Sequence, residues 1–127
     1  MIKKIHLINL LILLVLSVVT SFVLFNKSIA EAASKPTVIE FTSPMCSACN
    51  QLKQVLPAIE SKYGGQVNIR KINVAETDSE TSSLVSKYSV NFVPKLVFID
   101  GNGKVIRTTQ GFLSESQLDT YFKELIK

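Results

Sequence analysis

The sequence predicts one small α/β domain that follows a single apolar helix, and two observations lead to this fold class. From Thr37 onward, short β-branched or aromatic runs alternate with helical patterns in the order β-α-β-α-β-β-α. Before that region, residues 5–25 contain no charged side chain. The roughly 90 residues that follow the apolar segment are enough for one small hydrophobic core, so we expect a single folded domain.

The N-terminal segment has the length and composition of a transmembrane helix. Its 21 uncharged residues would span about 31 Å as a helix, which matches a bilayer core of roughly 30 Å. Lys3 and Lys4 favour a cytoplasmic location for the end that precedes it. We therefore predict a cytoplasmic stub at residues 1–4, a transmembrane signal-anchor at 5–25, a linker at 26–36 and a folded domain outside the cytoplasm at 37–127.

The alternative is a signal peptide that is cleaved after Ala30, which would release a secreted domain. Ser28 and Ala30 place small residues at the −3 and −1 positions of such a site, and Ala30 and Ala32 offer another. The apolar stretch is longer than the about 7–15 residues of a usual signal peptide, so we favour the anchor. Both alternatives place the domain outside the cytoplasm, where disulfides persist.

The charge and the content of metal-binding residues argue against two classes of function. Three of the 14 basic residues flank the apolar segment, and from Glu31 onward 11 basic residues stand against 10 acidic ones. The basic balance therefore gives no reason to expect nucleic acid as a partner. A structural zinc site needs four Cys or His ligands, whereas the chain has two cysteines and one histidine, His6, which lies in the apolar segment. We expect no metal and no cofactor.

The first half of the domain predicts a strand, a helix and a second strand. Residues 37–41 form a buried strand in which Glu40 is the only charged residue. Residues 46–63 have a helical pattern, with apolar side chains three or four positions apart at Leu52, Val55, Leu56 and Ile59. Residues 67–74 form the second strand. Their apolar side chains alternate in two separate halves, which a change of register near Arg70 would explain.

The second half predicts a helix, a hairpin and a final helix. Residues 77–88 begin with helix-start side chains and form a short helix. Residues 95–100 and 104–107 pair as a hairpin around a glycine-rich turn. Ser114 and Gln117 have the spacing of a capping box for the last helix. The core face of that helix carries Leu118, Tyr121, Phe122 and Leu125.

The two cysteines, Cys46 and Cys49, lie three positions apart at the start of the first domain helix. Two thiols at this spacing can close a small disulfide and reopen it. The helix dipole and the free N–H groups of the first turn would stabilise a thiolate on the first of them. The spacing therefore indicates thiol–disulfide exchange, and a pair of inert buried cysteines is the alternative.

From residue 37 to residue 127 the chain resembles the thioredoxin family. Four features carry the resemblance: Cys46-Ser47-Ala48-Cys49 opening a helix, Glu40 at the family's buried acidic position, Val93-Pro94 directly before the hairpin, and Gly111 after it. Only 11 residues separate Phe25 from Thr37, too few for the strand and helix that usually lead the family's fold. The resemblance implies a minimal thioredoxin-like fold, a four-stranded mixed sheet with helices on both faces, in which residues 67–74 form an edge strand.

The resemblance also implies roles for three of these residues. Cys46 would be the exposed nucleophile that attacks a substrate disulfide, and Cys49 the shielded thiol that resolves the mixed disulfide, so the two form a redox-active disulfide. Glu40 would be desolvated in its strand and would accept the proton of Cys49. The alternative for Glu40 is a side chain that points outward and is merely solvated.

The substrate side of the site is implied in the same way. Pro94 is expected to be cis and to face Cys46, which leaves the backbone of Val93 free to pair with an extended substrate segment. The alternative is a proline that simply starts a strand. Met45 takes the place of the tryptophan that is common before the first cysteine, and makes the rim of the site aliphatic. Lys95 replaces a common threonine and is expected to add positive charge near the site.

These features together predict an extracytoplasmic thiol–disulfide oxidoreductase that reduces disulfides of exported proteins. Ser47-Ala48 lacks the proline and histidine of strongly oxidising relatives, which favours a reductase. The expected partners are protein disulfide substrates, a transmembrane thiol that donates electrons, and the membrane through the N-terminal helix; we expect a monomer. The alternatives are a disulfide oxidase or isomerase, and a non-enzymatic module that binds extended peptides beside Pro94.

Overall fold

The computed structural model describes residues 1–27 and 34–127, with side chains described at positions 1–20 and 34–127. The chain divides into two compact units, Met1–Ala33 and Ser34–Lys127. The two alternative cleavage sites, after Ala30 and after Ala32, and the central part of the predicted linker lie outside the described residues.

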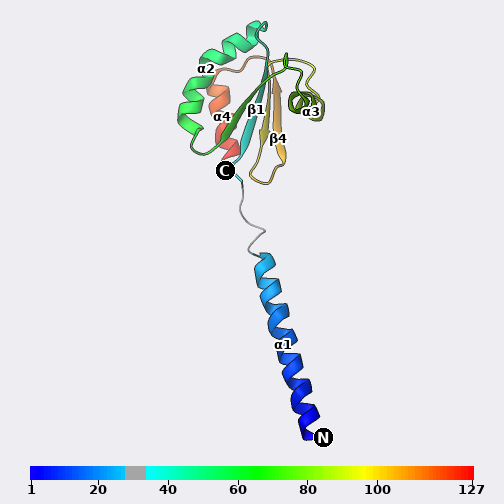
Figure 1. Cartoon of the computed structure of the whole chain (residues 1–127). Coiled ribbons are helices and arrows are strands. Elements are labelled where there is room, and N and C mark those ends of the chain that lie inside the picture. The colour runs from blue at the N-terminus through cyan, green and yellow to red at the C-terminus, as the bar shows by residue number, and fades with distance from the viewer. Residues whose placement is uncertain (28–33) are drawn as a thin grey trace. The chain divides into compact units, whose positions relative to one another are not determined.

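The first unit contains one helix, α1, which runs over Ile2–Lys27 (Figure 1). Its segment Ile2–Thr20 has a mean hydropathy of 2.1, and none of that segment is buried. A helix of this length and composition can cross a membrane, and a signal sequence near an N-terminus has the same properties. The helix covers the apolar segment at residues 5–25 and begins one turn earlier.

The second unit is built on a four-stranded mixed sheet, as expected. The strands are β1 (Thr37–Thr42), β2 (Asn68–Asn73), β3 (Lys95–Ile99) and β4 (Val105–Gln110). Their order across the sheet is β2-β1-β3-β4, so β2 lies at an edge. β1 pairs in parallel with β2 and antiparallel with β3, and β3 pairs antiparallel with β4.

Helices cover both faces of this sheet, which confirms the predicted layers. They are α2 (Ser47–Tyr63), α3 (Ser79–Lys87) and α4 (Glu115–Leu125) (Figure 1). Successive residues of a strand point to opposite faces. Accordingly Val38 of β1 packs in one cluster with α2 and α4, whereas Ile39 and Phe41 pack in a second cluster with α3.

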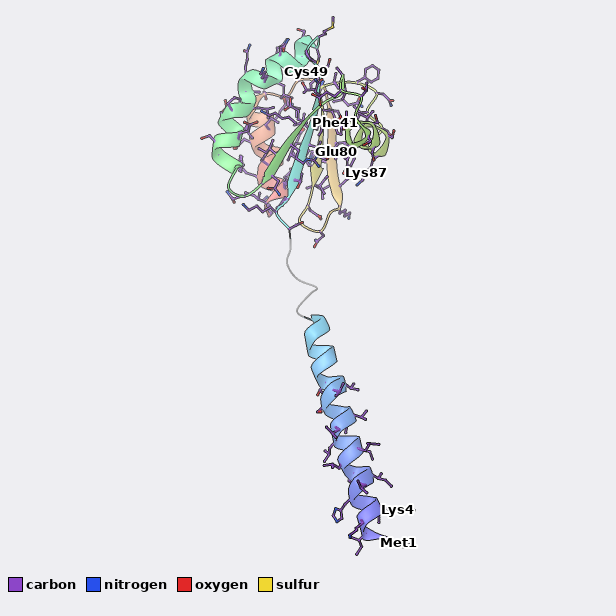
Figure 2. All side chains as sticks on the ribbon, in the orientation of Figure 1. Met1, Lys4, Phe41, Cys49, Glu80 and Lys87 are labelled. Atoms are coloured by element: carbon purple, nitrogen blue, oxygen red, sulfur yellow. A yellow bond between two sulfur atoms is a disulfide. The ribbon has the colours of Figure 1, made fainter. Side chains whose placement is uncertain are left out.

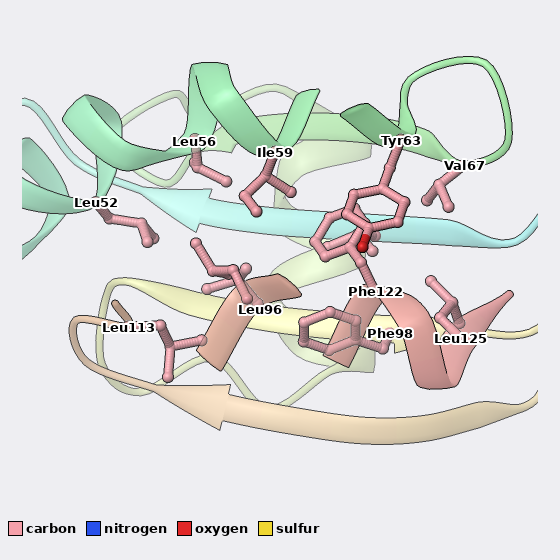
Figure 3. Close-up of a cluster of buried hydrophobic side chains, with 12 residues drawn as sticks. Leu52, Leu56, Ile59, Tyr63, Val67, Leu96, Phe98, Leu113, Phe122 and Leu125 are labelled. Carbon is pink, nitrogen blue, oxygen red and sulfur yellow. The ribbon is translucent and has the colours of Figure 1, made fainter. Parts of the chain in front are cut away.

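The larger cluster is closed by aromatic rings from the last helix. Phe98 of β3 lies edge-on to Phe122 of α4, with ring centroids 5.8 Å apart (Figure 3). It also lies edge-on to Tyr121 of α4, again with centroids 5.8 Å apart. Tyr63 at the end of α2 lies against Phe122, with centroids 5.2 Å apart. These contacts join α2, α4 and β3, and so hold α2, the helix that Cys46 caps, against the sheet.

The change of register expected near Arg70 is wrong. The pairing of β1 with β2 is continuous from Thr37 opposite Asn68 to Thr42 opposite Asn73. The two halves of the strand alternate differently because each half buries a different face. Ile69 packs towards α2 and α4, whereas Ile72 packs towards α3.

The hairpin is longer than its hydrophobic pattern suggested. β4 continues to Gln110, three residues beyond the predicted end, because polar Thr108 and Thr109 still pair with Val97 and Leu96 of β3. Gly111 then ends the strand with a φ of 85°, a conformation that favours glycine. The predicted capping box of α4 is confirmed, with Ser114 and Gln117 satisfying each other's backbone N–H groups.

Candidate active site

The cysteine pair lies where the first strand leads into α2. Cys46 is the N-cap residue of α2, and it is joined to Cys49 by a disulfide with the two Cα atoms 5.2 Å apart. The Cys49 backbone N–H donates to Cys46 Sγ at 3.1 Å. Figure 2 labels Cys49 at the end of the sheet where α2 begins. Once the disulfide is reduced, this N–H and the positive end of the helix dipole would stabilise a thiolate on Cys46.

The two sulfur atoms differ in their access to solvent. Cys46 is half-buried, whereas Cys49 is only 2% exposed and belongs to the core side of α2. An incoming disulfide can therefore reach the first sulfur but not the second. This difference suits Cys46 to attack and Cys49 to resolve.

Val93 and Pro94 lie directly beside the first cysteine. The peptide bond between them is cis, and Val93 O lies 3.5 Å from Cys46 Sγ. Pro94 is buried, and its carbonyl accepts a hydrogen bond from Gly111 N at 2.8 Å. The loop before β3 and the end of β4 are thus tied together next to the disulfide.

Exposed apolar side chains flank this loop and the CxxC turn. Met45, at the predicted rim position, is 97% exposed. Phe92, which precedes Val93, is 71% exposed, and Phe112, which follows Gly111, is also exposed. The sequence reasoning missed both phenylalanines. The available signal was the position of Phe92 next to Val93, which was already assigned to the site, and of Phe112 next to Gly111.

Glu40 points into the protein, so the solvated alternative is wrong. It is 3% exposed, and it lies opposite Leu96 of β3 and Lys71 of β2. Its Oε2 atom is buried and has no hydrogen-bond partner among the described residues. Burial raises the pKa of the Glu40 carboxyl above its ordinary value. A nearby Glu60 also raises this pKa, and the positive charges of Lys71 and Lys53 oppose the rise.

One cavity connects the buried carboxylate with the buried cysteine. Its volume is about 310 Å³, and its lining residues are Glu40, Thr42, Ser43, Pro44, Cys49, Asn50, Lys53, Lys71 and Asn73. A cavity with several polar partners and this much room can hold water. Glu40 and Cys49 therefore line one cavity, and water in that cavity would contact both residues.

Lys95, which was expected to add charge near the site, directs its ammonium to two backbone carbonyl groups. It is buried, and its Nζ donates to Tyr88 O at 2.6 Å and to Ser89 O at 3.0 Å. These carbonyl groups lie at the C-terminal end of α3, where a cation is favourable. Lys95 thus anchors α3 to the strand that follows Pro94.

Among the described residues, no group of three or more His, Cys, Asp or Glu side chains is placed to hold a metal ion.

A family model described as a thioredoxin-like domain matches residues 26–126. The chain belongs to the thioredoxin-like domain family. Its Cys46–Cys49 pair, placed at the start of α2, makes it a member of a family of thiol–disulfide oxidoreductases.

Individual relatives of this thioredoxin-like chain agree with that assignment. It is 27% identical over 100 residues to a thioredoxin of Haemophilus influenzae, which covers 79% of this chain and 89% of that protein. It is 30% identical over 77 residues to the thiol:disulfide interchange protein TxlA homolog of Synechocystis, covering 61% of this chain and 42% of that one. A solved structure of thioredoxin-2, described as a component of malaria parasite protein secretion machinery, superposes with a TM-score of 0.63 at 21% identity over 71% of this chain and 82% of that chain. At this identity the superposition shows the fold alone.

Replacing Glu40 with glutamine is expected to stabilise the oxidised thioredoxin-like domain at neutral pH. The folded state holds the pKa of Glu40 above its unfolded value, so the folded chain keeps a proton that the unfolded chain loses. Stability therefore falls as the pH rises through the raised pKa, and a glutamine does not titrate. Urea unfolding of the full chain in detergent should give a higher midpoint for the variant at neutral pH. The gain should shrink below the ordinary glutamate pKa of about 4.3.

The matched control for this measurement is Glu80→Gln, which removes an exposed carboxylate that pairs with Arg70. It should give no stabilisation at any pH. An equal gain in both variants would mean that the effect comes from net charge and not from the burial of Glu40.

Proposed function

We propose that this chain is a membrane-anchored, extracytoplasmic protein-disulfide reductase that acts through the Cys46–Cys49 dithiol. The observation that carries the proposal is the asymmetric cysteine pair: an accessible sulfur at a helix N-cap beside Val93 O, joined to a buried sulfur that shares a cavity with Glu40. This arrangement supplies a nucleophile, a resolving thiol and a proton acceptor at one end of the sheet.

The two electrons that reduce the substrate disulfide come from the Cys46–Cys49 dithiol, so the reaction needs no cofactor. The Cys46 thiolate attacks one sulfur of a substrate disulfide; a Cys46–substrate disulfide forms, and the other substrate sulfur leaves as a thiolate that takes a proton from water. Cys49 gives its proton to Glu40, and its thiolate then attacks Cys46 Sγ. The substrate sulfur that was bonded to Cys46 then leaves as a thiolate. The substrate has thereby gained two electrons, and the protein ends with the Cys46–Cys49 disulfide.

Three features support a substrate site at Val93, Pro94 and Met45. Val93 offers a backbone carbonyl close to the reacting sulfur, which suits pairing with an extended segment. Pro94 is buried and fixed by Gly111, so the loop is held in place. Met45 and Phe92 present exposed apolar side chains on either side, and a flexible thioether adapts to different neighbours.

The location outside the cytoplasm rests on α1. Its apolar span is long enough for a bilayer, and Lys3 and Lys4 at its start favour the cytoplasmic side. A domain that follows such a span lies on the opposite side of the membrane. The reductase then needs electrons from the cytoplasm, and a transmembrane protein with a reactive dithiol would supply them by the same exchange in reverse.

The reduction potential of the Cys46–Cys49 pair tests the direction of the exchange. We expect a value near that of thioredoxin, about −270 mV, because the turn between the cysteines, Ser47-Ala48, lacks the proline and the histidine of strongly oxidising relatives. The measurement equilibrates the full chain in detergent with dithiothreitol mixtures and counts free thiols by alkylation and mass spectrometry. The Cys46→Ser variant should show no such transition. A value near about −120 mV would make the protein an oxidase and overturn the proposal.

A further inference from the structure

Lys71 lies between two carboxylates that come from different elements. On β2 it stands directly opposite Glu40 in the parallel pairing with β1, so both side chains lie on the face covered by α2. Its ammonium nevertheless pairs with Glu60, one turn before the end of α2, with Nζ 2.5 Å from Glu60 Oε1. That oxygen is buried, and the contact is an ion pair without the alignment of a hydrogen bond.

Glu40 is left without a partner by this arrangement. Its Oε2 makes no hydrogen bond among the described residues, although the side chain is almost fully buried. The charged or titratable groups around it are Lys53, Glu60 and, once reduced, Cys49 on α2, and Lys71 on β2. Its neighbour on β3 is Leu96, which carries no charge. A lysine is therefore available opposite the carboxylate but is held by another acid.

We propose that Glu60 is a positioning residue, which binds the ammonium of Lys71 from α2 and thereby keeps Glu40 unpaired and able to accept a proton from Cys49. The inference rests on the proposed function, because it assigns a purpose to the base strength of Glu40. The pairing of β1 with β2 does not require Glu60, because backbone hydrogen bonds would keep Lys71 opposite Glu40 without it.

The physical argument has two parts that act in the same direction. The negative charge of Glu60 disfavours ionisation of Glu40, and this holds the pKa of Glu40 up. The charge of Lys71 already favours the ionised form of Glu40, and by binding its ammonium Glu60 limits that effect. An acid that is too easily ionised is a weak base, so losing Glu60 would weaken the acceptor for the Cys49 proton.

The test is a titration of the Glu40 carboxyl in the oxidised full chain, followed by NMR with ¹³C-labelled glutamate. The oxidised state contains no free thiol, so the titration does not depend on catalysis. The Glu40 signal is assigned by its loss in Glu40→Gln. We expect Glu60→Gln to lower the pKa of Glu40, Lys71→Gln to raise it, and Glu60→Asp, which keeps the charge, to restore most of the wild-type value.

The control variant is Glu80→Gln, which removes the same charge from an ion pair with Arg70, the neighbour of Lys71 on β2. Arg70 stands opposite Ile39 and so lies on the other face of the sheet. Glu80→Gln should leave the pKa of Glu40 unchanged. An unchanged pKa in Glu60→Gln, or an equal shift in Glu80→Gln, would overturn the inference.

A kinetic measurement separates this inference from the proposed function. The rate at which the mixed disulfide is released should fall at acid pH, where Glu40 becomes protonated. This fall should move to lower pH in Glu60→Gln and should be absent in Glu40→Gln. If Glu40→Gln leaves the profile unchanged, Glu40 is not the proton acceptor, and the proposed mechanism fails even where the NMR shifts appear. If the profile depends on Glu40 but neither the profile nor the NMR signal responds to Glu60→Gln, only the role of Glu60 fails.

Discussion

Replacing Cys49 with serine is expected to leave the protein covalently joined to its substrates through Cys46 and to reduce catalysed disulfide reduction to the background rate of the dithiol reagent. Cys46 keeps its place at the N-cap of α2, so it can still attack a disulfide. The serine hydroxyl cannot displace the substrate from Cys46 Sγ. Mixed disulfides should therefore accumulate in membranes of cells that express the variant, and they are seen on non-reducing gels and identified by mass spectrometry.

The control for this trapping experiment is Cys46→Ser, in which the remaining Cys49 is buried and should capture nothing. The trapped proteins also report on location, because a domain outside the cytoplasm should capture exported proteins. A binding module without redox turnover would give no covalent adduct in either variant. Equal trapping by both variants would contradict the assignment of Cys46 as the nucleophile.

Truncating Phe98 to alanine is expected to lower the free energy of unfolding of the domain by about 3–5 kcal/mol. The ring is fully buried and meets two rings of α4 edge-on, so its removal leaves a cavity between the sheet and that helix. Urea unfolding of the full chain in detergent, followed by near-ultraviolet circular dichroism, measures the loss. The chain has three tyrosines and no tryptophan, and all three tyrosines lie in the domain, so the tyrosine band reports on the domain and not on α1.

Phe92→Ala is the matched control, since the same side chain is removed from a position that is 71% exposed. Its free energy of unfolding should change by no more than about 0.5 kcal/mol. A comparable loss in both variants would mean that the rings at Phe98, Tyr121 and Phe122 do not carry the core contacts described above.

Much of the fold could be predicted because short patterns in the sequence have few structural interpretations. The β-branched and aromatic run in residues 37–41, the 3–4 spacing in α2 and the capping box at Ser114 each specify their element by local chemistry. The cysteine spacing likewise placed both thiols at one helix start. For these features, the element that the local sequence pattern predicts is the element that the structure contains.

Other features could not be predicted because they depend on residues distant in the sequence. Glu40 is buried because β1 is a central strand with packed clusters on both of its faces, and residues 37–41 alone do not contain that information. The ammonium of Lys95 is directed by two carbonyl groups at the end of α3, not by its neighbour Pro94. β4 extends through polar Thr108 and Thr109 because β3 offers backbone partners there.

The edge strand β2 carries its own protection against unwanted association. Strands at the edge of a sheet invite pairing with other chains, and long charged side chains discourage it. β2 presents Arg70 and Lys71 on opposite faces, and each is held in place by an ion pair to a helix, to Glu80 and to Glu60 respectively. A neighbouring strand that approached this edge would have to disturb both ion pairs. These ion pairs therefore make the β2 edge a poor template for pairing with a strand of another chain.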